Sequence, residues 1–168
     1  MIQVQVGRLV HYAGGALVRP MRSDLASTTA ASREVWAQCG EAVRDRLELV
    51  GEVPVGGAVI TPAGDLPCDF LIHAVTSTPT EAEAPLTVQQ ALRNALRRAA
   101  DWGVESLAVP PMGGGVGVMG LEEAATSQVE ILRDHLDEGP EPRDLTILVA
   151  NAYEEDVYGR LIASLLEE

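Results

Sequence analysis

The sequence predicts an α/β fold, specifically a three-layer α/β/α sandwich with a mixed, mostly parallel central sheet. Short β-rich runs alternate with helical stretches along the 168 residues. A helix between successive strands implies a crossover connection, which makes neighbouring strands parallel in a sheet covered on both faces. The chain shows no internal repeat and no linker, so we expect a single domain over residues 1–168.

The first third of the chain predicts two short strands followed by a long helix. The strands are expected at 2–6 and 16–18, with residues 11–15 forming a turn between them. This opening pair favours a mixed sheet over an all-parallel one. A helix is expected over 28–49, because apolar side chains recur there at four-residue spacing on one face, at Val35, Cys39, Val43 and Leu47.

The middle of the chain predicts a pair of strands and a second helix. The β-rich runs 58–61 and 70–75 are separated by 62–67, whose proline and glycine residues favour a tight connection. Thr87 is the expected N-cap of a helix that reaches Trp102. The buried stripe of this helix is expected to hold Val88, Ala91, Leu92, Ala95, Leu96 and Ala99.

The last third centres on a glycine-dense loop. A buried strand over 107–109 stops at two prolines, the loop follows over 113–120, and a helix over 121–136 comes next. A final strand over 144–150 and a helix over 154–166 complete the chain. Such a loop lets backbone N–H groups approach a ligand closely, and the helix N-terminus adds a partial positive charge. This arrangement indicates a phosphate or pyrophosphate cradle; the alternative is a glycine linker without a ligand.

Composition excludes several functions and favours others. With 12 basic and 25 acidic residues the formal charge is −13, which argues against general nucleic-acid binding. The chain has no lysine, and therefore no P-loop lysine and no Schiff-base lysine. Cys39 and Cys68 lack metal-site spacing and do not make a disulfide framework, so we expect a reducing cytoplasm. No membrane segment, signal peptide, metal site or cofactor is expected, and oligomeric state is left open.

Three segments carry a resemblance to a known family. In residues 57–75, one strand ends in Thr-Pro and the next ends in Ile-His-Ala-Val. Residues 106–125 contain a strand, a Gly-Val-rich loop and the helix start Leu-Glu-Glu-Ala-Ala. Residues 145–166 contain a closing strand and a helix with Tyr158. From Gly51 onward the chain therefore resembles the macrodomain family. The resemblance implies a macrodomain-like sandwich that binds ADP-ribose or a related nucleotide, with the second glycine loop holding the distal part of the ligand.

The first fifty residues depart from the family pattern. Gly7-Arg8-Leu9 is the nearest match to the usual Gly-Asp-Ile, so the Asp that the family uses for the adenine amino group is not evident. Residues 17–22 stand where the family has Ile-Val-Asn-Ala-Ala-Asn, and both asparagines are replaced. Residues 23–31 stand in place of the first glycine loop, and Gly117 takes the position of an aromatic residue in the second loop.

Three side chains outside the glycine loop are further candidates. Arg19 and Arg22 follow the expected second strand, where a guanidinium fork could pair with phosphate, or the two could be ordinary solvated arginines. Asn151 follows the last expected strand and could contact the ligand or cap the next helix. His73 is expected to be a satisfied core histidine. The candidate ligand-binding set is therefore Gly113, Gly114, Gly115, Val116, Gly117, Val118, Met119, Arg19, Arg22 and Asn151.

The resemblance leaves three functions open. The first is binding of ADP-ribose or a related nucleotide diphosphate. The second is hydrolysis, either of ADP-ribose from protein side chains or of O-acetyl-ADP-ribose, with no catalytic residue assigned and Asp24 the only carboxylate near the altered strand end. The third is an interaction module that has lost its ligand. A dinucleotide-binding Rossmann site is a formal rival, because 115–120 reads Gly-x-Gly-x-x-Gly, but the motif comes late and lacks a suitably spaced acidic residue.

Overall fold

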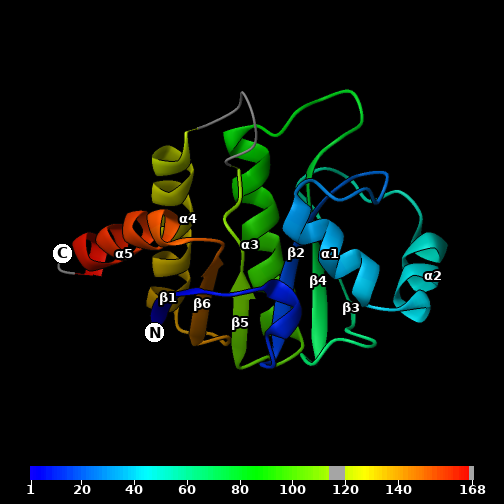
Figure 1. The fold of residues 1–168 in the computed structure, drawn as a ribbon, viewed down its shortest axis with the longest axis horizontal. Coiled ribbons are helices and arrows are strands. Elements are labelled where there is room, and N and C mark those ends of the chain that lie inside the picture. Colours follow the sequence, from blue (N-terminus) through cyan, green and yellow to red (C-terminus); the bar gives the residue numbers. More distant parts are fainter. Residues whose placement is uncertain (114–119, 167–168) are drawn as a thin grey trace.

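The computed structural model describes residues 1–113 and 120–166, which form a six-stranded sheet between two layers of helices (Figure 1). The strands are β1 (Ile2–Val6), β2 (Ala16–Arg22), β3 (Ala58–Pro62), β4 (Phe70–Ser77), β5 (Ser106–Val109) and β6 (Asp144–Val149). Their order across the sheet is β1-β6-β5-β2-β4-β3, and every neighbouring pair is parallel except β3 with β4. The predicted α/β/α class with a mixed, mostly parallel sheet is confirmed.

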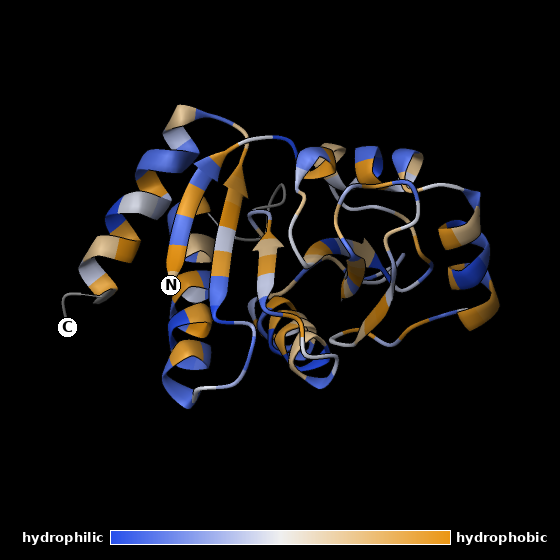
Figure 2. Cartoon of the chain, turned by 90° about the horizontal axis from the view of Figure 1, so that it is seen from below, coloured by the Kyte–Doolittle hydropathy of each residue, from blue (hydrophilic) through white to orange (hydrophobic). Residues whose placement is uncertain are grey.

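The helices divide between the two faces of the sheet. They are η1 (Leu9–His11), α1 (Ala30–Gln38), α2 (Glu41–Val50), α3 (Pro85–Asp101), α4 (Leu121–Glu138) and α5 (Ala152–Leu166). The buried side chains of α3, α4 and α5 form one apolar cluster with the sheet, and those of η1, α1 and α2 form another. Figure 2 shows helices on both sides of the sheet, with hydrophobic and hydrophilic positions alternating along them.

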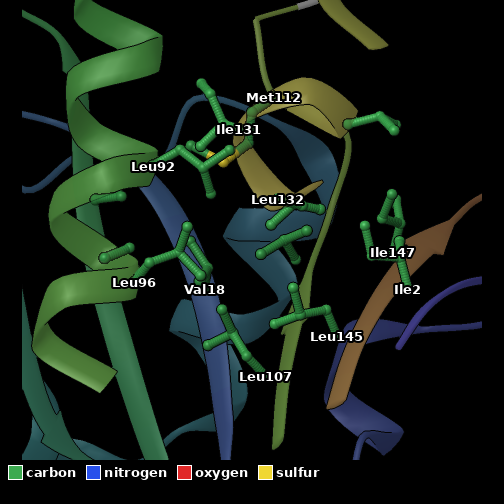
Figure 3. Close-up of a cluster of buried hydrophobic side chains, with 14 of the residues drawn as sticks. Ile2, Val18, Leu92, Leu96, Leu107, Met112, Ile131, Leu132, Leu145 and Ile147 are labelled. Carbon is green, nitrogen blue, oxygen red and sulfur yellow. The ribbon is translucent and has the colours of Figure 1, made fainter. Parts of the chain in front are cut away.

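The strands bury both of their faces because successive side chains point to opposite layers. Leu17 packs in the cluster of η1, α1 and α2, and its neighbour Val18 packs in that of α3, α4 and α5. Leu71 and Ile72 of β4 divide in the same way. Figure 3 shows the larger cluster, where labelled side chains of α3 and α4 gather over those of β1, β2, β5 and β6, namely Leu92, Leu96, Ile131, Leu132, Ile2, Val18, Leu107, Leu145 and Ile147.

The pairing of the strands corrects one step of the sequence argument. β1 and β2 do not pair with each other, because β1 lies beside β6 at the sheet edge and β2 lies between β5 and β4. The antiparallel pair that makes the sheet mixed is β3 with β4, joined by the short connection expected from its proline and glycine residues. β2 is also longer than predicted, since it continues through Arg19 to Arg22.

Two predicted helix boundaries were wrong. The single helix expected over 28–49 is broken at Gly40, whose φ of 102° lies in the left-handed region, and α1 and α2 follow each other there. A Cβ at Gly40 would also lie 2.6 Å from a carboxylate oxygen of Asp65. Thr87 is not the N-cap of α3, because that helix begins at Pro85; the Thr87 hydroxyl instead accepts the Ala84 N–H at 3.1 Å.

In the described part of the chain, no helix combines the length and the apolar character that crossing a membrane requires.

Candidate functional site

A cavity of about 590 Å³ lies at the carboxyl ends of the parallel strands. Ligands of α/β sheets bind in the crevice at this edge, and the volume falls within the range of small-molecule sites. The surface of the cavity is mainly apolar. Its apolar lining includes Val6, Leu9, Pro20, Pro110, Pro111, Met112, Leu121, Leu148 and Val149.

The first turn of α1 forms part of the cavity. Thr28, Thr29, Ala30 and Ala31 line it, and Thr29 caps the helix because its Oγ1 accepts the Ser32 N–H at 3.0 Å. The free N–H groups and the dipole at the start of a helix favour a negatively charged ligand. The buried Thr28 Oγ1 at this end of the helix has no hydrogen-bond partner among the described residues.

The C-terminal wall of the cavity, residues 110–113 with Leu121, is held by the buried side chain of Gln128 on α4. Gln128 Nε2 donates to the Pro110 carbonyl at 2.8 Å, and Gln128 Oε1 accepts the Met112 N–H at 3.2 Å. The Tyr158 hydroxyl of α5 donates to the same Oε1 at 2.7 Å. Burial raises the pKa of Tyr158 well above its usual value, so this hydroxyl remains a donor.

The N-terminal wall of the cavity, residues 28–31, follows directly on a segment that is held by Arg19 of β2. Its side chain is fully buried, and its Nη2 donates to the Leu25 carbonyl at 3.0 Å and to Ser27 Oγ at 2.8 Å. The guanidinium also lies over the Trp36 ring of α1, 4.4 Å from its centroid. Among the described residues no carboxylate pairs with Arg19.

A chain of polar groups extends from Arg19 to β3. Arg19 Nη1 lies 3.2 Å from His73 Nδ1, and His73 Nε2 lies 2.9 Å from Thr61 Oγ1. A guanidinium can only donate, so His73 Nδ1 accepts and its Nε2 carries the proton. Burial and the neighbouring positive charge of Arg19 lower the pKa of His73 well below its usual value. The expectation of a satisfied core histidine matches this arrangement.

Burial has a smaller effect on Arg19 itself. Removal from water lowers the pKa of Arg19 to about 10, which leaves the guanidinium charged at neutral pH. Its donors are spread over the Leu25 carbonyl, the Ser27 hydroxyl, the His73 ring and, at 3.2 Å, the sulfur of Met21. The N-terminal wall therefore depends on one buried positive charge.

Four charged side chains line the cavity. Arg8 follows β1 and pairs with Glu34 of α1 at 2.8 Å. Glu154 Oε1 accepts the Ala150 N–H at 2.8 Å near the start of α5. Glu83, in the segment between β4 and α3, is half-buried and makes no hydrogen bond or ion pair within the described part of the chain.

A second hollow, of about 420 Å³, opens at the opposite edge of the sheet between Gly15, Asp69 and Trp102. This hollow lies at the amino ends of the parallel strands, where α3 presents its C-terminus at Asp101. The last carbonyl groups of a helix carry a partial negative charge. The two edges therefore differ in the ligands they favour, and a phosphate-bearing ligand fits the carboxyl edge.

The structure separates the predicted site residues. Gly113 lines the cavity, whereas Gly114, Gly115, Val116, Gly117, Val118 and Met119 lie outside the described residues. Arg19 does not reach the cavity, since its donors are committed to the core. It is neither a phosphate-facing nor a solvated arginine. Arg22 is paired at the surface with Asp24 at 2.6 Å and does not line the cavity.

Asn151 follows β6, and its Oδ1 accepts the Glu154 N–H at 2.9 Å. This is the cap geometry, one of the two interpretations weighed from the sequence. Asn151 does not line the cavity, although its neighbour Ala150 does. Asp24, the carboxylate considered near the altered strand end, is also absent from the cavity because Arg22 holds it.

Sequence reasoning missed the charged residues that do line the cavity. Arg8 was noted only as a departure from the family pattern, and Glu34, Glu83 and Glu154 were not singled out. One weak feature of the sequence could have pointed to Glu34 as a site residue. It lies near the start of a helix that follows a strand, at the carboxyl ends of the strands. Glu83 lies in a polar connection without a motif, and only the folded chain places it beside β2 and β5.

The described residues do not indicate a metal or thiol site. They contain no group of three or more His, Cys, Asp or Glu side chains that could hold a metal ion. Cys39 and Cys68 are buried, and burial raises the pKa of each thiol, that of Cys68 to about 11. Thiols of this kind stay protonated at neutral pH and are poor nucleophiles.

Comparisons with known proteins agree on one family. The Macro domain family model matches residues 18–127. An uncharacterized protein of Aeropyrum pernix is 35% identical over 126 residues, which cover 74% of this chain and 67% of that protein. A protein of Enterobacter cloacae named O-acetyl-ADP-ribose deacetylase is 34% identical over 139 residues, which cover 81% of this chain and 77% of that protein.

Solved structures show the same fold at lower identity. A mutant macrodomain of Oceanobacillus iheyensis with ADPR matches with a TM-score of 0.83 and 18% identity, covering 98% of this chain and 93% of that one. The Trypanosoma brucei macrodomain in complex with ADP-ribose matches with a TM-score of 0.85 and 18% identity, covering 96% of this chain and 68% of that one.

Proposed function

The chain belongs to the Macro domain family, and we propose that it binds ADP-ribose or a related nucleotide diphosphate in the cavity at the carboxyl edge. The observation that carries the proposal is that the first turns of α1 and α4 both border this apolar cavity, at Ala30, Ala31 and Leu121. Two helix N-termini suit a diphosphate, and apolar walls suit a base and sugars.

The glycine loop completes the proposed site. Gly113 lines the cavity at the end of the wall that Gln128 holds, and the loop continues from there over 114–119. We assign these backbone N–H groups to the pyrophosphate and the adjoining ribose, as the sequence predicts. The structure of the Trypanosoma brucei macrodomain in complex with ADP-ribose supports the choice of ligand.

Paired loop variants test this assignment. The double substitution Gly115→Val and Gly117→Val should abolish ADP-ribose binding in calorimetry, because branched side chains keep the ligand away from the backbone. Gly159→Ala is the matched control: it lies in α5, where an added Cβ would meet Val4 at an ordinary 3.8 Å. Unchanged affinity in the folded double variant would contradict the loop assignment.

A second candidate function is hydrolysis of O-acetyl-ADP-ribose. The Enterobacter cloacae protein of that name, 34% identical, supports it. Wild-type protein should then release acetate from O-acetyl-ADP-ribose, whereas a protein that only binds should leave the ester intact. An interaction module without a ligand is the remaining alternative, and it predicts neither binding nor acetate release.

A further inference from the structure

We propose that Glu83 is the carboxylate that contacts the sugar end of the ligand and activates the water for ester hydrolysis. The proposal rests on the hydrolytic candidate function above. It begins from a difference among the cavity carboxylates. Glu34 is neutralised by Arg8 and Glu154 accepts a backbone N–H, but Glu83 has no partner among the described residues.

Glu83 lies on a different connection of the chain from the other charged residues of the cavity. Arg8 and Glu154 belong to the side of β1 and β6, at one edge of the sheet. Glu83 lies at the end of the connection from β4 to α3, two residues before α3 begins at Pro85. The charged lining therefore comprises the ion pair of Arg8 with Glu34 and two carboxylates with no cationic partner among the described residues, of which only Glu83 also lacks a hydrogen bond there.

The position of Glu83 is fixed by hydrogen bonds on both sides of it along the chain. Before it, Glu81 N–H donates to Thr78 Oγ1 at 2.9 Å, and Thr78 N–H donates to the Glu81 carbonyl at 3.0 Å. After it, Ala84 N–H donates to Thr87 Oγ1 at 3.1 Å in the first turn of α3. Glu83 thus lies in a short segment between the hydrogen-bonded residues Thr78 and Glu81 and the first turn of α3.

Charge decides which part of the ligand meets Glu83. A carboxylate repels a phosphate, whereas it accepts hydrogen bonds from sugar hydroxyls and from water. The diphosphate is favoured at the helix N-termini instead. A ligand with a phosphate in the middle and a hydroxyl-bearing or acylated sugar at one end satisfies both conditions when that sugar faces Glu83.

The reaction at this end balances with water alone. The water oxygen bonds to the ester carbonyl carbon while the Glu83 carboxylate takes a proton from the water. The bond from that carbon to the sugar oxygen then breaks, and the proton passes to the departing oxygen. Acetic acid, which releases its proton to the solvent as acetate, and the free sugar hydroxyl leave, and Glu83 is again a carboxylate. A general base of this kind contributes about 10²- to 10⁴-fold to a rate.

Glu83→Gln and the matched control Glu81→Gln test the proposal. Both remove one carboxylate from the connection between β4 and α3, but Glu81 is exposed and does not line the cavity. With O-acetyl-ADP-ribose, Glu83→Gln should lower kcat at least about 100-fold. Its Kd for ADP-ribose should be unchanged or lower, because a negative charge has left the cavity. Glu81→Gln should match the wild type in both measurements.

Three results would overturn the assignment of Glu83. The first is a kcat for Glu83→Gln within about threefold of the wild type, far from the loss expected of a missing base. The second is an equal loss in Glu81→Gln, and the third is a wild type that binds ADP-ribose but releases no acetate. The third result would leave the proposed binding function intact. Absence of ADP-ribose binding by folded wild-type protein would overturn the binding function together with the role of Glu83.

Discussion

One wall of the cavity is held by a neutral amide, that of Gln128, and the other by a charged guanidinium, that of Arg19. Gln128 bonds to the backbone of two residues that line the cavity, and Arg19 bonds to Leu25 and Ser27, just before the lining residues 28–31. Gln128 has its donor and its acceptor both matched, and Tyr158 supports it from α5. Arg19 has its Nε unpaired among the described residues and its charge opposed by no carboxylate.

The difference shows two ways to fix a cavity wall. A neutral clamp such as Gln128 costs little to bury once its hydrogen bonds are made. A buried cation loses hydration, so Arg19 persists only because several donors and the Trp36 ring compensate for that loss. We therefore expect the N-terminal wall to be the more sensitive to substitution and the more sensitive to pH.

The largest expected effect is that of Arg19→Ala. The change removes the donors to Leu25 and Ser27 and leaves a void under Trp36. We expect a loss of about 3–5 kcal/mol in the free energy of unfolding, measured with urea. Arg19→Met keeps most of the volume and should recover part of this loss. A loss below about 1 kcal/mol in Arg19→Ala would contradict the bracing role of Arg19.

A smaller loss is expected at the C-terminal wall. Gln128→Leu leaves the Met112 N–H, the Pro110 carbonyl and the Tyr158 hydroxyl without their partner, which should cost about 2–3 kcal/mol in urea unfolding. Tyr158→Phe removes a single hydrogen bond and should cost about 1 kcal/mol. If Tyr158→Phe cost more than Gln128→Leu, the tyrosine rather than the amide would be the main support of this wall.

The charged wall also predicts a pH dependence through His73. The pKa of His73 is lowered in the folded state, first by burial and then by Arg19, so the unfolded chain binds the additional proton on acidification. Stability from this group is complete above the unfolded value of 6.5 and is lost as pH falls below it, by up to about 1.4 kcal/mol per pH unit. Urea midpoints between pH 7.5 and pH 5, bracketing that unfolded pKa, measure the slope. The slope should flatten in His73→Gln, and an equal slope in that variant would assign it to other groups.

The smallest expected effect is that of Arg22→Ala. Arg22 pairs with Asp24 at the surface, and surface ion pairs add little to stability. The variant should unfold at the wild-type temperature and bind ADP-ribose with the wild-type Kd and salt dependence. A weaker affinity that also loses salt dependence would restore Arg22 as a phosphate contact.

Prediction from the sequence succeeded where the signal is local. The shared face of Val35, Cys39, Val43 and Leu47 is buried as expected, because apolar spacing reports which side of a helix meets the core. The break at Gly40 was missed for the same reason, since the spacing continues across it. The helix breaks at a glycine in the left-handed region, next to Cys39, whose carbonyl accepts the N–H of Asp65, a residue far along the chain.

The candidate site was less predictable than the fold. Arginine is ordinarily a surface residue, and the burial of Arg19 depends on Trp36 and His73, which are distant in sequence. Glu83 has no motif around it and becomes a cavity residue only through the sheet order. The location of the site at the carboxyl ends of the strands was predictable, because glycine loops and helix N-termini follow the strand ends. Which side chains face the cavity depends on the packed fold.

Titration calorimetry of the folded wild-type protein with ADP-ribose, beside AMP, tests most directly whether this cavity binds a nucleotide diphosphate. We predict micromolar binding of ADP-ribose that is clearly tighter than that of AMP, because the diphosphate and the second sugar add contacts at the helix N-termini and at the far end of the cavity. Absence of heat with both ligands, from a sample shown to be folded, would contradict the proposed function.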